Sequence, residues 1–269
     1  MKIAILGAGH MGGWLARILN RDHLVGVYDC QVELAGRIPG IEVFLEVGRL
    51  AGFVPDMLIN AVSIQNTRAA FRESLPYLPE GCLLADVMSV KNGIRDYYTK
   101  CGFRFVSLHP MFGPTFANVD RLEEENAVII AESDPGGKEF FRRLFQGFGI
   151  NVVDYSFEEH DRKIAYSLTL PFASTLVFAA NMDKRTVPGT TFRKHTLIAQ
   201  GLLSEDDALL SEILFSPHSL NQLEKVTQRL EFLKHIIRQK DFEEAHRFFS
   251  RLRKNIGLES PAEAGKQTD

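Results

Sequence analysis

The chain has 269 residues, enough for two domains, and its 45% hydrophobic and 24% charged residues are typical of a folded globular protein. A net charge of −3 and the lack of a long apolar run argue against a nucleic-acid-binding surface and against a membrane, so neither partner is expected. Three widely spaced cysteines, Cys30, Cys82 and Cys101, predict neither a disulfide framework nor a metal site, and they favour the reducing cytoplasm.

The first thirty residues have the order of elements that binds a dinucleotide. Residues 2–6 are apolar with β-branched side chains, which predicts a strand, and residues 24–28 predict a second strand that ends at Asp29. Between them, residues 7–12 are Gly-Ala-Gly-His-Met-Gly, followed by a helix-compatible segment at 13–19. Strand, G-x-G-x-x-G, helix, strand and acid, at this spacing, are typical of the βαβ unit of a Rossmann domain.

Each glycine of this motif has an expected physical role. Gly7 permits a tight turn, Gly9 lets backbone amides approach a pyrophosphate, and Gly12 lets the helix pack closely. Asp29 would accept hydrogen bonds from ribose hydroxyls and repel a 2′-phosphate, which favours NAD over NADP, although Arg37 offers that phosphate an alternative partner. The residues expected to bind the cofactor are Gly7, Gly9, His10, Met11, Gly12, Asp29, Ala61, Val62 and Ser63.

Apolar strands alternate with helical segments through the rest of the first half. Strands are expected at residues 57–62, 81–85, 103–108 and 127–131, and a helix at 67–77. This alternation predicts a mostly parallel sheet covered by helices on both faces. Polar segments follow three of the strands, at residues 60–63, 86–91 and 109–115. Since ligands bind outside the carboxyl ends of parallel strands, these segments and the glycine-rich turn are expected to converge on one site.

His109 is the candidate for proton transfer. Pro110 forces it into extended backbone geometry, and an imidazole titrates near neutral pH, although such a histidine could also merely cap a strand. Ser89 could cap the following helix, hydrogen-bond the His109 ring or hold a substrate hydroxyl. Lys91 could be a solvated surface lysine or could close over cofactor or a substrate carboxylate.

The second half of the chain is expected to be helical. Apolar residues recur at helical spacing at residues 158–182, 191–203, 206–215, 218–239 and 241–256. Pro171 lies inside the first of these helices and should kink it. The many phenylalanines of this half favour burial against a second subunit, so a two-fold homodimer is expected. The predicted domains are a Rossmann domain at 1–155, a helical substrate and dimerisation domain at 156–258 and a disordered tail at 259–269.

Charged residues of the helical half are further candidates. Residues 158–161, Glu-Glu-His-Asp, are either solvated acids with an incidental histidine or place His160 beside the cleft. Arg193 and Lys194 would by default be exposed basic residues, but an anionic substrate would need such cations near an interdomain cleft.

Four motifs, in this order, resemble the prephenate dehydrogenase family of tyrosine biosynthesis. They are the glycine motif, residues 86–91 (Asp-Val-Met-Ser-Val-Lys), residues 109–114 (His-Pro-Met-Phe-Gly-Pro) and residues 159–161 (Glu-His-Asp). The resemblance implies an α/β fold, with an N-terminal Rossmann domain and a C-terminal all-helical dimerisation domain. It implies NAD(P)-dependent oxidative decarboxylation of prephenate, or of arogenate, to 4-hydroxyphenylpyruvate or tyrosine.

The resemblance also assigns roles to residues. His109 would take the proton from the ring hydroxyl, and Ser89 would be its hydrogen-bond partner. The residues expected to bind the anionic substrate are Ser89, Lys91, His109, Arg193 and Lys194.

The chain departs from the family pattern at two places. Residues 167–172 are Ser-Leu-Thr-Leu-Pro-Phe, where many members have Ser-His-Leu-Pro-His, and Leu197 stands at the family's substrate-binding arginine. Either the substrate differs, or that arginine is replaced by Arg193, Lys194, His195 or Gln200. Two other functions therefore stay open: a β-hydroxyacid or imine-type dehydrogenase of the same architecture, and a non-catalytic dinucleotide-binding regulator.

Overall fold

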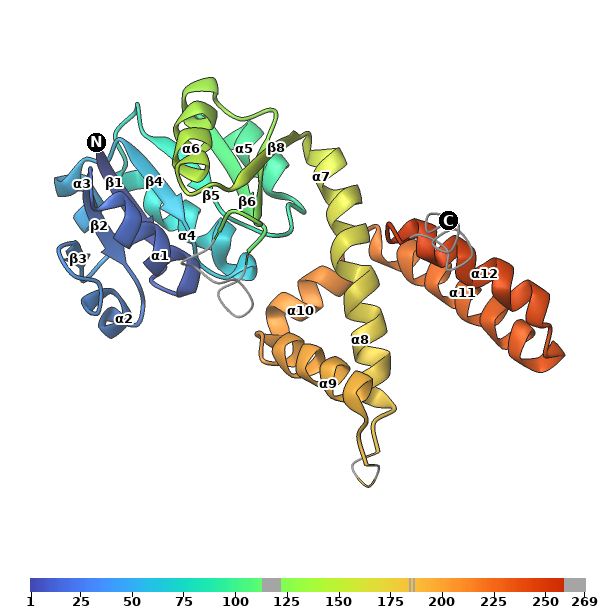
Figure 1. Cartoon of the computed structure of the whole chain (residues 1–269). Helices are drawn as coiled ribbons and strands as arrows, with labels where there is room; N and C mark the ends of the chain where they lie inside the picture. Colours follow the sequence, from blue (N-terminus) through green and yellow to red (C-terminus); the bar gives the residue numbers. More distant parts are fainter. Residues whose placement is uncertain (113–121, 184, 186, 259–269) are drawn as a thin grey trace, which may run out of the picture. The chain divides into compact units, whose positions relative to one another are not determined.

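The computed structural model describes residues 1–112, 122–183, 185 and 187–258. The tail predicted at 259–269 and the last part of the polar segment predicted at 109–115 lie outside these residues. The chain divides into two compact units, Met1–Leu220 and Asn221–Asp269, and each is described by itself (Figure 1).

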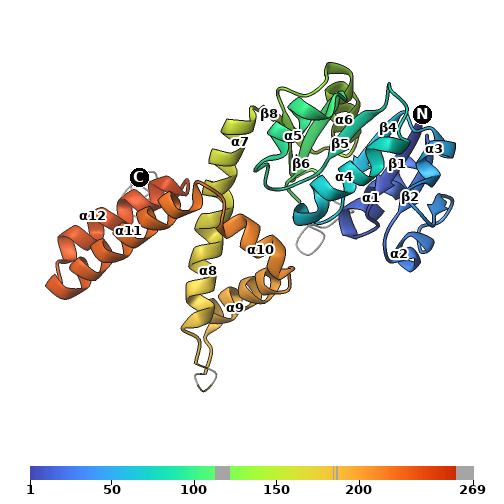
Figure 2. The same ribbon diagram turned by 180° about the vertical axis from the view of Figure 1, so that it is seen from behind.

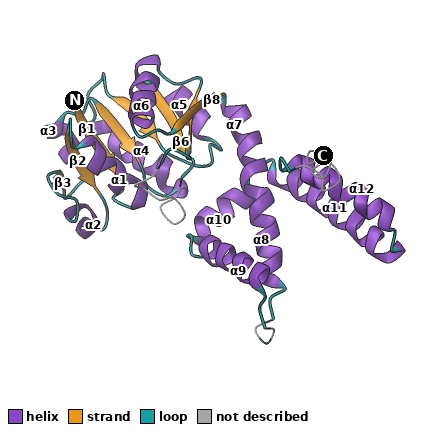
Figure 3. Ribbon diagram, viewed as in Figure 1, coloured by secondary structure: helices purple, strands orange, loops and turns teal. Residues whose placement is uncertain are grey.

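An eight-stranded sheet forms the centre of the first unit, with strand order β3-β2-β1-β4-β5-β6-β7-β8 (Figure 3). The strands are β1 (Lys2–Leu6), β2 (Leu24–Tyr28), β3 (Glu42–Phe44), β4 (Met57–Asn60), β5 (Leu83–Asp86), β6 (Phe105–Pro110), β7 (Asn126–Ile130) and β8 (Asn151–Tyr155). Neighbouring strands pair in parallel except for β6 and β7, which are antiparallel. The predicted mostly parallel sheet is therefore confirmed.

Helices cover both faces of the sheet because its strands are apolar on both sides. In β1, Ile3 and Ile5 face one core and Ala4 and Leu6 face the other. The first core includes side chains of α1 (His10–Leu19), α2 (Val32–Gly36) and α6 (Pro135–Gly147). The second includes side chains of α3 (Arg49–Phe53), α4 (Thr67–Ser74), α5 (Ile94–Cys101) and α7 (Phe157–Ile164). Figures 1 and 2 show the two faces from opposite sides.

The structure corrects several predicted boundaries. The edge strand β3, only three residues long, was too short to predict from its pattern. Helix α1 begins at His10 instead of Gly13, so the second half of the glycine motif is itself helical. Strand β6 continues through His109 to Pro110, because both pair with the antiparallel strand β7. His109 therefore lies inside a strand and does not follow one.

The helical half follows the prediction closely. Helix α7 continues through a π-helical segment (Ala165–Thr169) into α8 (Leu170–Ala180), and the remaining helices are α9 (Thr190–Leu203), α10 (Asp207–Leu214), α11 (Ser219–Gln239) and α12 (Phe242–Asn255). Ser156 and Glu159 form a capping box at the start of α7. The π-helical segment comes directly before Pro171. A wider turn there accommodates a ring that lacks an N–H and crowds the preceding turn.

The predicted domain boundary at residue 155 marks a change of secondary structure, but the compact unit continues to Leu220. The helical half begins inside this unit because Phe157 of α7 is buried in the core that includes α3, α4 and α5. His160, one turn further along the same helix, is also fully buried. In the second unit, α11 and α12 pair through the rings of Phe232 and Phe248, whose centroids are 5.3 Å apart.

Candidate active site

The glycine-rich turn connects β1 to α1 at the point where the strand order reverses between β1 and β4. Gly7 has a φ of 93°, which other residues rarely adopt, and a Cβ there would lie 2.7 Å from the Ala61 carbonyl oxygen. A Cβ on Gly12 would overlap the Gly7 carbonyl oxygen. Both positions therefore require glycine, and Gly12 packs on the turn itself.

Gly9 differs from Gly7 and Gly12 because a Cβ there would meet no atom of the described residues within 4 Å. Gly9 stands directly before α1, and among the residues that the structure describes no side chain caps this helix. The first backbone N–H groups of an uncapped helix attract phosphate oxygens, helped by the helix dipole. The turn thus fits the diphosphate of a dinucleotide, which would approach at Gly9.

Asp29, at the end of β2, has a structural role that the sequence analysis did not foresee. One carboxylate oxygen accepts a hydrogen bond from the Ala8 amide at 2.6 Å, and the other accepts one from the Gln31 amide at 2.8 Å. Asp29 thereby fixes the glycine-rich turn against the next strand. A carboxylate has about four acceptor positions, so this role is compatible with the predicted one toward ribose hydroxyls.

Two glycine substitutions should separate cofactor binding from the stability of the fold. We expect Gly9→Ala to leave the thermal unfolding temperature unchanged but to weaken NADH binding at least about tenfold, because the methyl group would occupy the path of the diphosphate. Gly12→Ala is the matched control and should destabilise the fold by about 1–3 kcal/mol through overpacking. Fluorescence titration of NADH and thermal unfolding of both variants measure this. Unchanged NADH affinity in Gly9→Ala would place the cofactor elsewhere.

Lys91 lies neither on the surface nor over an open cleft. Its side chain is fully buried, and its ammonium group donates to Asp86 at 2.5 Å and to the Leu108 carbonyl at 2.6 Å. Asp86 also accepts a hydrogen bond from the Tyr98 hydroxyl at 2.7 Å. Burial lowers the pKa of Lys91, and Asp86 opposes that shift. Lys91 therefore ties the end of β5 to β6 beside His109, which corrects the interpretation of a solvated lysine.

His109 is 5% exposed and is paired with a second buried imidazole. Its Nδ1 lies 3.0 Å from Nε2 of His160, and Nδ1 of His160 lies 3.1 Å from the Asp161 carboxylate. Strand β6 and helix α7 thus bring together residues 51 positions apart in the chain. Of the two interpretations of residues 158–161, the incidental histidine is wrong. Glu-His-Asp, directly after a capped helix start, was the only sequence signal for this pairing.

The surroundings keep both imidazoles neutral near physiological pH. Burial holds the pKa of His109 well below its ordinary value of 6.5, and neighbouring His160 and Lys91 lower it further. Burial also lowers the pKa of His160, while its hydrogen bond to Asp161 opposes the shift. A neutral imidazole at the carboxyl edge of the sheet can accept a proton. Three strand spacings, about 14 Å, separate this strand from β1 and its glycine-rich turn.

Comparisons with known proteins show which enzymes the chain resembles. Residues 46–151 match the family model described as prephenate dehydrogenase, nucleotide-binding domain. The chain is 25% identical, over 97% of its length, to a probable arogenate/prephenate dehydrogenase of Methanocaldococcus jannaschii, of which it covers 62%. It is 26% identical, over 87% of its length, to the chloroplastic arogenate dehydrogenase 2 of Arabidopsis thaliana, of which it covers 69%. It thus spans less than two thirds of the M. jannaschii relative.

A solved structure shares the fold over nearly the whole chain. It is prephenate dehydrogenase from A. aeolicus in complex with hydroxyphenyl propionate and NAD+, with a TM-score of 0.81 and 21% identity, covering 95% of this chain and 96% of that one. The chain is thus similar to prephenate and arogenate dehydrogenases. The predicted fold class, a Rossmann domain followed by helices, is confirmed.

Ser89 does not occupy the place that the family resemblance implied. It is half-buried, and in the part of the chain that the structure describes it makes no hydrogen bond to His109, whose Nδ1 faces His160. The alternative role as a helix cap is also wrong, because Gly93 precedes α5 at that position. A role of Ser89 toward a substrate hydroxyl stays a prediction.

The predicted substrate cations lie on α9, far in sequence from the imidazole pair. Arg193 and Lys194 are exposed, and the Arg193 guanidinium approaches only the Thr190 hydroxyl, at 3.5 Å. Arg193 borders a cavity of about 410 Å³ that Leu197 also lines. Leu197, at the position of the family's arginine, is 66% exposed. Within the described residues, no hydrogen bond or ion pair connects these cations to His109.

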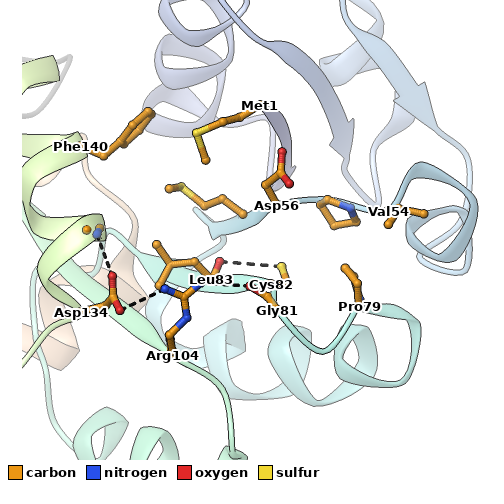
Figure 4. A pocket seen from close by; sticks show the side chains of 14 residues that line it. Met1, Val54, Asp56, Pro79, Gly81, Cys82, Leu83, Arg104, Asp134 and Phe140 are labelled. Carbon is orange, nitrogen blue, oxygen red and sulfur yellow. Dashed lines mark hydrogen bonds and ion pairs between the residues drawn. The ribbon is translucent and has the colours of Figure 1, made fainter.

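A second cavity, of about 600 Å³, lies at the opposite edge of the sheet, where β1, β4, β5 and β6 begin (Figure 4). Its charged side chains already have hydrogen-bond partners. Arg104 contacts Asp134 at 3.3 Å and the Gly81 carbonyl at 3.2 Å, and Asp56 accepts from the Lys2 amide at 2.7 Å. This cavity lies at the opposite end of the strands from His109 and the glycine-rich turn. The described part of the chain contains no group of three or more side chains that could hold a metal ion.

Proposed function

We propose that the protein catalyses NAD-dependent oxidative decarboxylation of prephenate or arogenate. The observation that carries the proposal is the buried His109, neutral and hydrogen-bonded, at the same sheet edge as a glycine-rich turn where a Cβ on Gly9 would meet no atom of the described residues. Similarity to prephenate and arogenate dehydrogenases supports the substrate class. NAD is favoured over NADP because the Asp29 carboxylate would repel a 2′-phosphate.

Each residue of the site would contribute one physical effect. The turn at residues 7–12 would hold the cofactor's diphosphate through backbone N–H groups, Asp29 would contact the ribose, and residues 61–63 would flank the nucleotide at the switch point. Bound NAD supplies an acceptor for the hydride from the substrate ring. His109 would accept the proton of the ring hydroxyl through Nε2. The oxygen's electron pair then forms a ketone, which is an electron sink for loss of carbon dioxide as the ring becomes aromatic.

The substrate's carboxylates need cations, and the family's arginine is absent at Leu197. We propose Arg193 as its replacement and Lys194 as the alternative, because both are exposed near the start of α9. A charge-assisted hydrogen bond from either residue would be strong enough to position a carboxylate. Ser89 would hold a substrate hydroxyl.

The proposed activity is tested by absorbance of NADH formed from prephenate and from arogenate, each with NAD and with NADP. We expect turnover with at least one cyclohexadienyl acid and a higher kcat/KM with NAD. Turnover only with simple β-hydroxyacids or imines would favour the other dehydrogenase type. NADH binding without turnover of any of these compounds would favour a non-catalytic regulator.

We propose a homodimer formed through the helical half. Apolar side chains on α8 and α9 are exposed, among them Val177 at 52%, Leu197 at 66% and Ile198 at 52%.

The helix from Phe157 to Ala180 is long and apolar enough to cross a membrane by length and composition alone, which the sequence analysis did not foresee. Its first turns pack against the sheet domain, where Phe157 and His160 are buried, which favours a helix of a folded protein. A cytoplasmic location stays a proposal, supported by three free cysteines.

A further inference from the structure

Asp161, His160 and His109 form a hydrogen-bonded series. His160 uses both of its ring nitrogens, one toward Asp161 and one toward His109, whereas His109 uses only Nδ1. We infer that His160 and Asp161 are positioning residues that keep the proton of His109 on Nδ1 and leave its Nε2 free to accept a proton. The inference rests on the proposed role of His109 as a base. Its structural content, the protonation pattern of two imidazoles, can be measured without any substrate.

The protonation pattern follows from the carboxylate at one end of the series. An ionised carboxylate can only accept hydrogen bonds, so Nδ1 of His160 must carry its proton toward Asp161. A neutral imidazole carries one proton, and Nε2 of His160 is therefore an acceptor. It faces Nδ1 of His109 at 3.0 Å, so Nδ1 of His109 must be the donor. The unprotonated nitrogen of His109 is then Nε2, the atom that the proposed reaction requires.

The opposite pattern is disfavoured by the same contacts. If His109 carried its proton on Nε2, its Nδ1 lone pair would need a donor from His160. The lone pair of His160 Nδ1 would then face the Asp161 carboxylate. His160 is fully buried, so a repulsive contact there would not be relieved by water.

Other charged groups near the pair act in the same direction. Lys91, from the segment after β5, lowers the pKa of both imidazoles, and Asp86, its partner, partly offsets this at His160. A second proton on the pair is therefore disfavoured before the reaction. After the reaction, the imidazolium of His109 would donate through Nδ1 to His160, whose other side faces the Asp161 carboxylate.

The protonation pattern can be read by ¹⁵N NMR of the full-length protein with labelled histidines. The chain has eight histidines, and the signals of His109 are assigned by their loss in His109→Asn. We expect His109 to be protonated at Nδ1 and unprotonated at Nε2, and His160 to show the same pattern. A wild-type His109 protonated at Nε2 would overturn the inference whether or not the protein turns over any substrate.

Two substitutions of His160 separate positioning from packing. His160→Gln keeps an acceptor oxygen near the former Nε2, whereas His160→Leu has similar bulk and no acceptor. We expect His160→Leu to shift the His109 proton to Nε2 and to lower kcat about 10²-fold with KM within about twofold. His160→Gln should keep the His109 pattern and recover most of kcat.

The NMR and kinetic results can contradict the positioning role and the proposed function separately. An unchanged His109 pattern in His160→Leu, or equal kcat in the Leu and Gln variants, would overturn the positioning role. If prephenate and arogenate are not turned over by the wild type, the proposed function fails, and the NMR comparison still decides the positioning role. Thermal unfolding of both variants checks that they are folded. If His160→Leu does not fold, the wild-type spectrum still tests the protonation pattern of His109.

Discussion

His109→Asn is expected to lower kcat by about 10²–10⁴-fold, the usual contribution of a general base, while leaving NADH affinity within about twofold. The asparagine amide can donate to Nε2 of His160 from near the position of Nδ1, so the buried hydrogen bond at 3.0 Å would have a replacement. The basic nitrogen on the other side of the ring would be lost. Steady-state kinetics and NADH fluorescence titration measure the two effects separately.

The pH dependence of the wild type provides an independent check on the same residue. The base is active when unprotonated, and burial, His160 and Lys91 hold the pKa of His109 well below its ordinary value of 6.5. The charged groups that bear on the pair are Lys91, Asp86 and Asp161. We therefore expect kcat/KM to stay level as the pH falls to 6.5 and to decline only below it. A decline that begins above pH 6.5, or normal turnover in His109→Asn, would contradict the assigned role.

Lys91→Met is expected to lower the free energy of unfolding by about 3–5 kcal/mol, the usual cost of removing one partner from a buried ion pair. The substitution would leave the Asp86 carboxylate buried without its cation and the Leu108 carbonyl without its donor. The Tyr98 hydroxyl would still donate to Asp86. Urea unfolding of the wild type and the variant measures the difference.

A matched control for Lys91→Met is Lys138→Met. Lys138 pairs with Asp154 at 3.5 Å, but both side chains are partly exposed, at 24% and 38%. Such a pair contributes at most about 1 kcal/mol. The double variant Asp86→Asn, Lys91→Met should recover part of the lost stability, because it removes the unpaired charge. Equal losses in Lys91→Met and Lys138→Met would show that the buried pair is not the main stabilising contact at this position.

The fold was predictable where local rules decide it. Gly7 and Gly12 are required by steric contacts with backbone a few residues or one strand away, and the βαβ spacing shows this directly. The helices after residue 156 follow from apolar periodicity, and their boundaries are correct to within one or two residues except around Pro171. These features depend on contacts that a short stretch of sequence contains.

The site was less predictable because tertiary packing decides it. Lys91 is a lysine in a loop, and only the positions of Asp86 and the Leu108 carbonyl explain its burial. His160 pairs with a residue 51 positions away, so its spacing in the chain contained no sign of a partner. Ser89, in contrast, lies two residues before Lys91 in sequence and makes no hydrogen bond to His109 in the described structure.

The position of Asp29 has a consequence for redesign of the cofactor preference. Replacing an acid at the end of the second strand is the obvious way to admit the extra phosphate of NADP. Here the same carboxylate accepts from the Ala8 amide inside the glycine-rich turn and from the Gln31 amide behind it. A substitute without both acceptor oxygens would loosen the turn that is expected to hold the diphosphate. Selectivity and affinity for the nucleotide would then have to be engineered together.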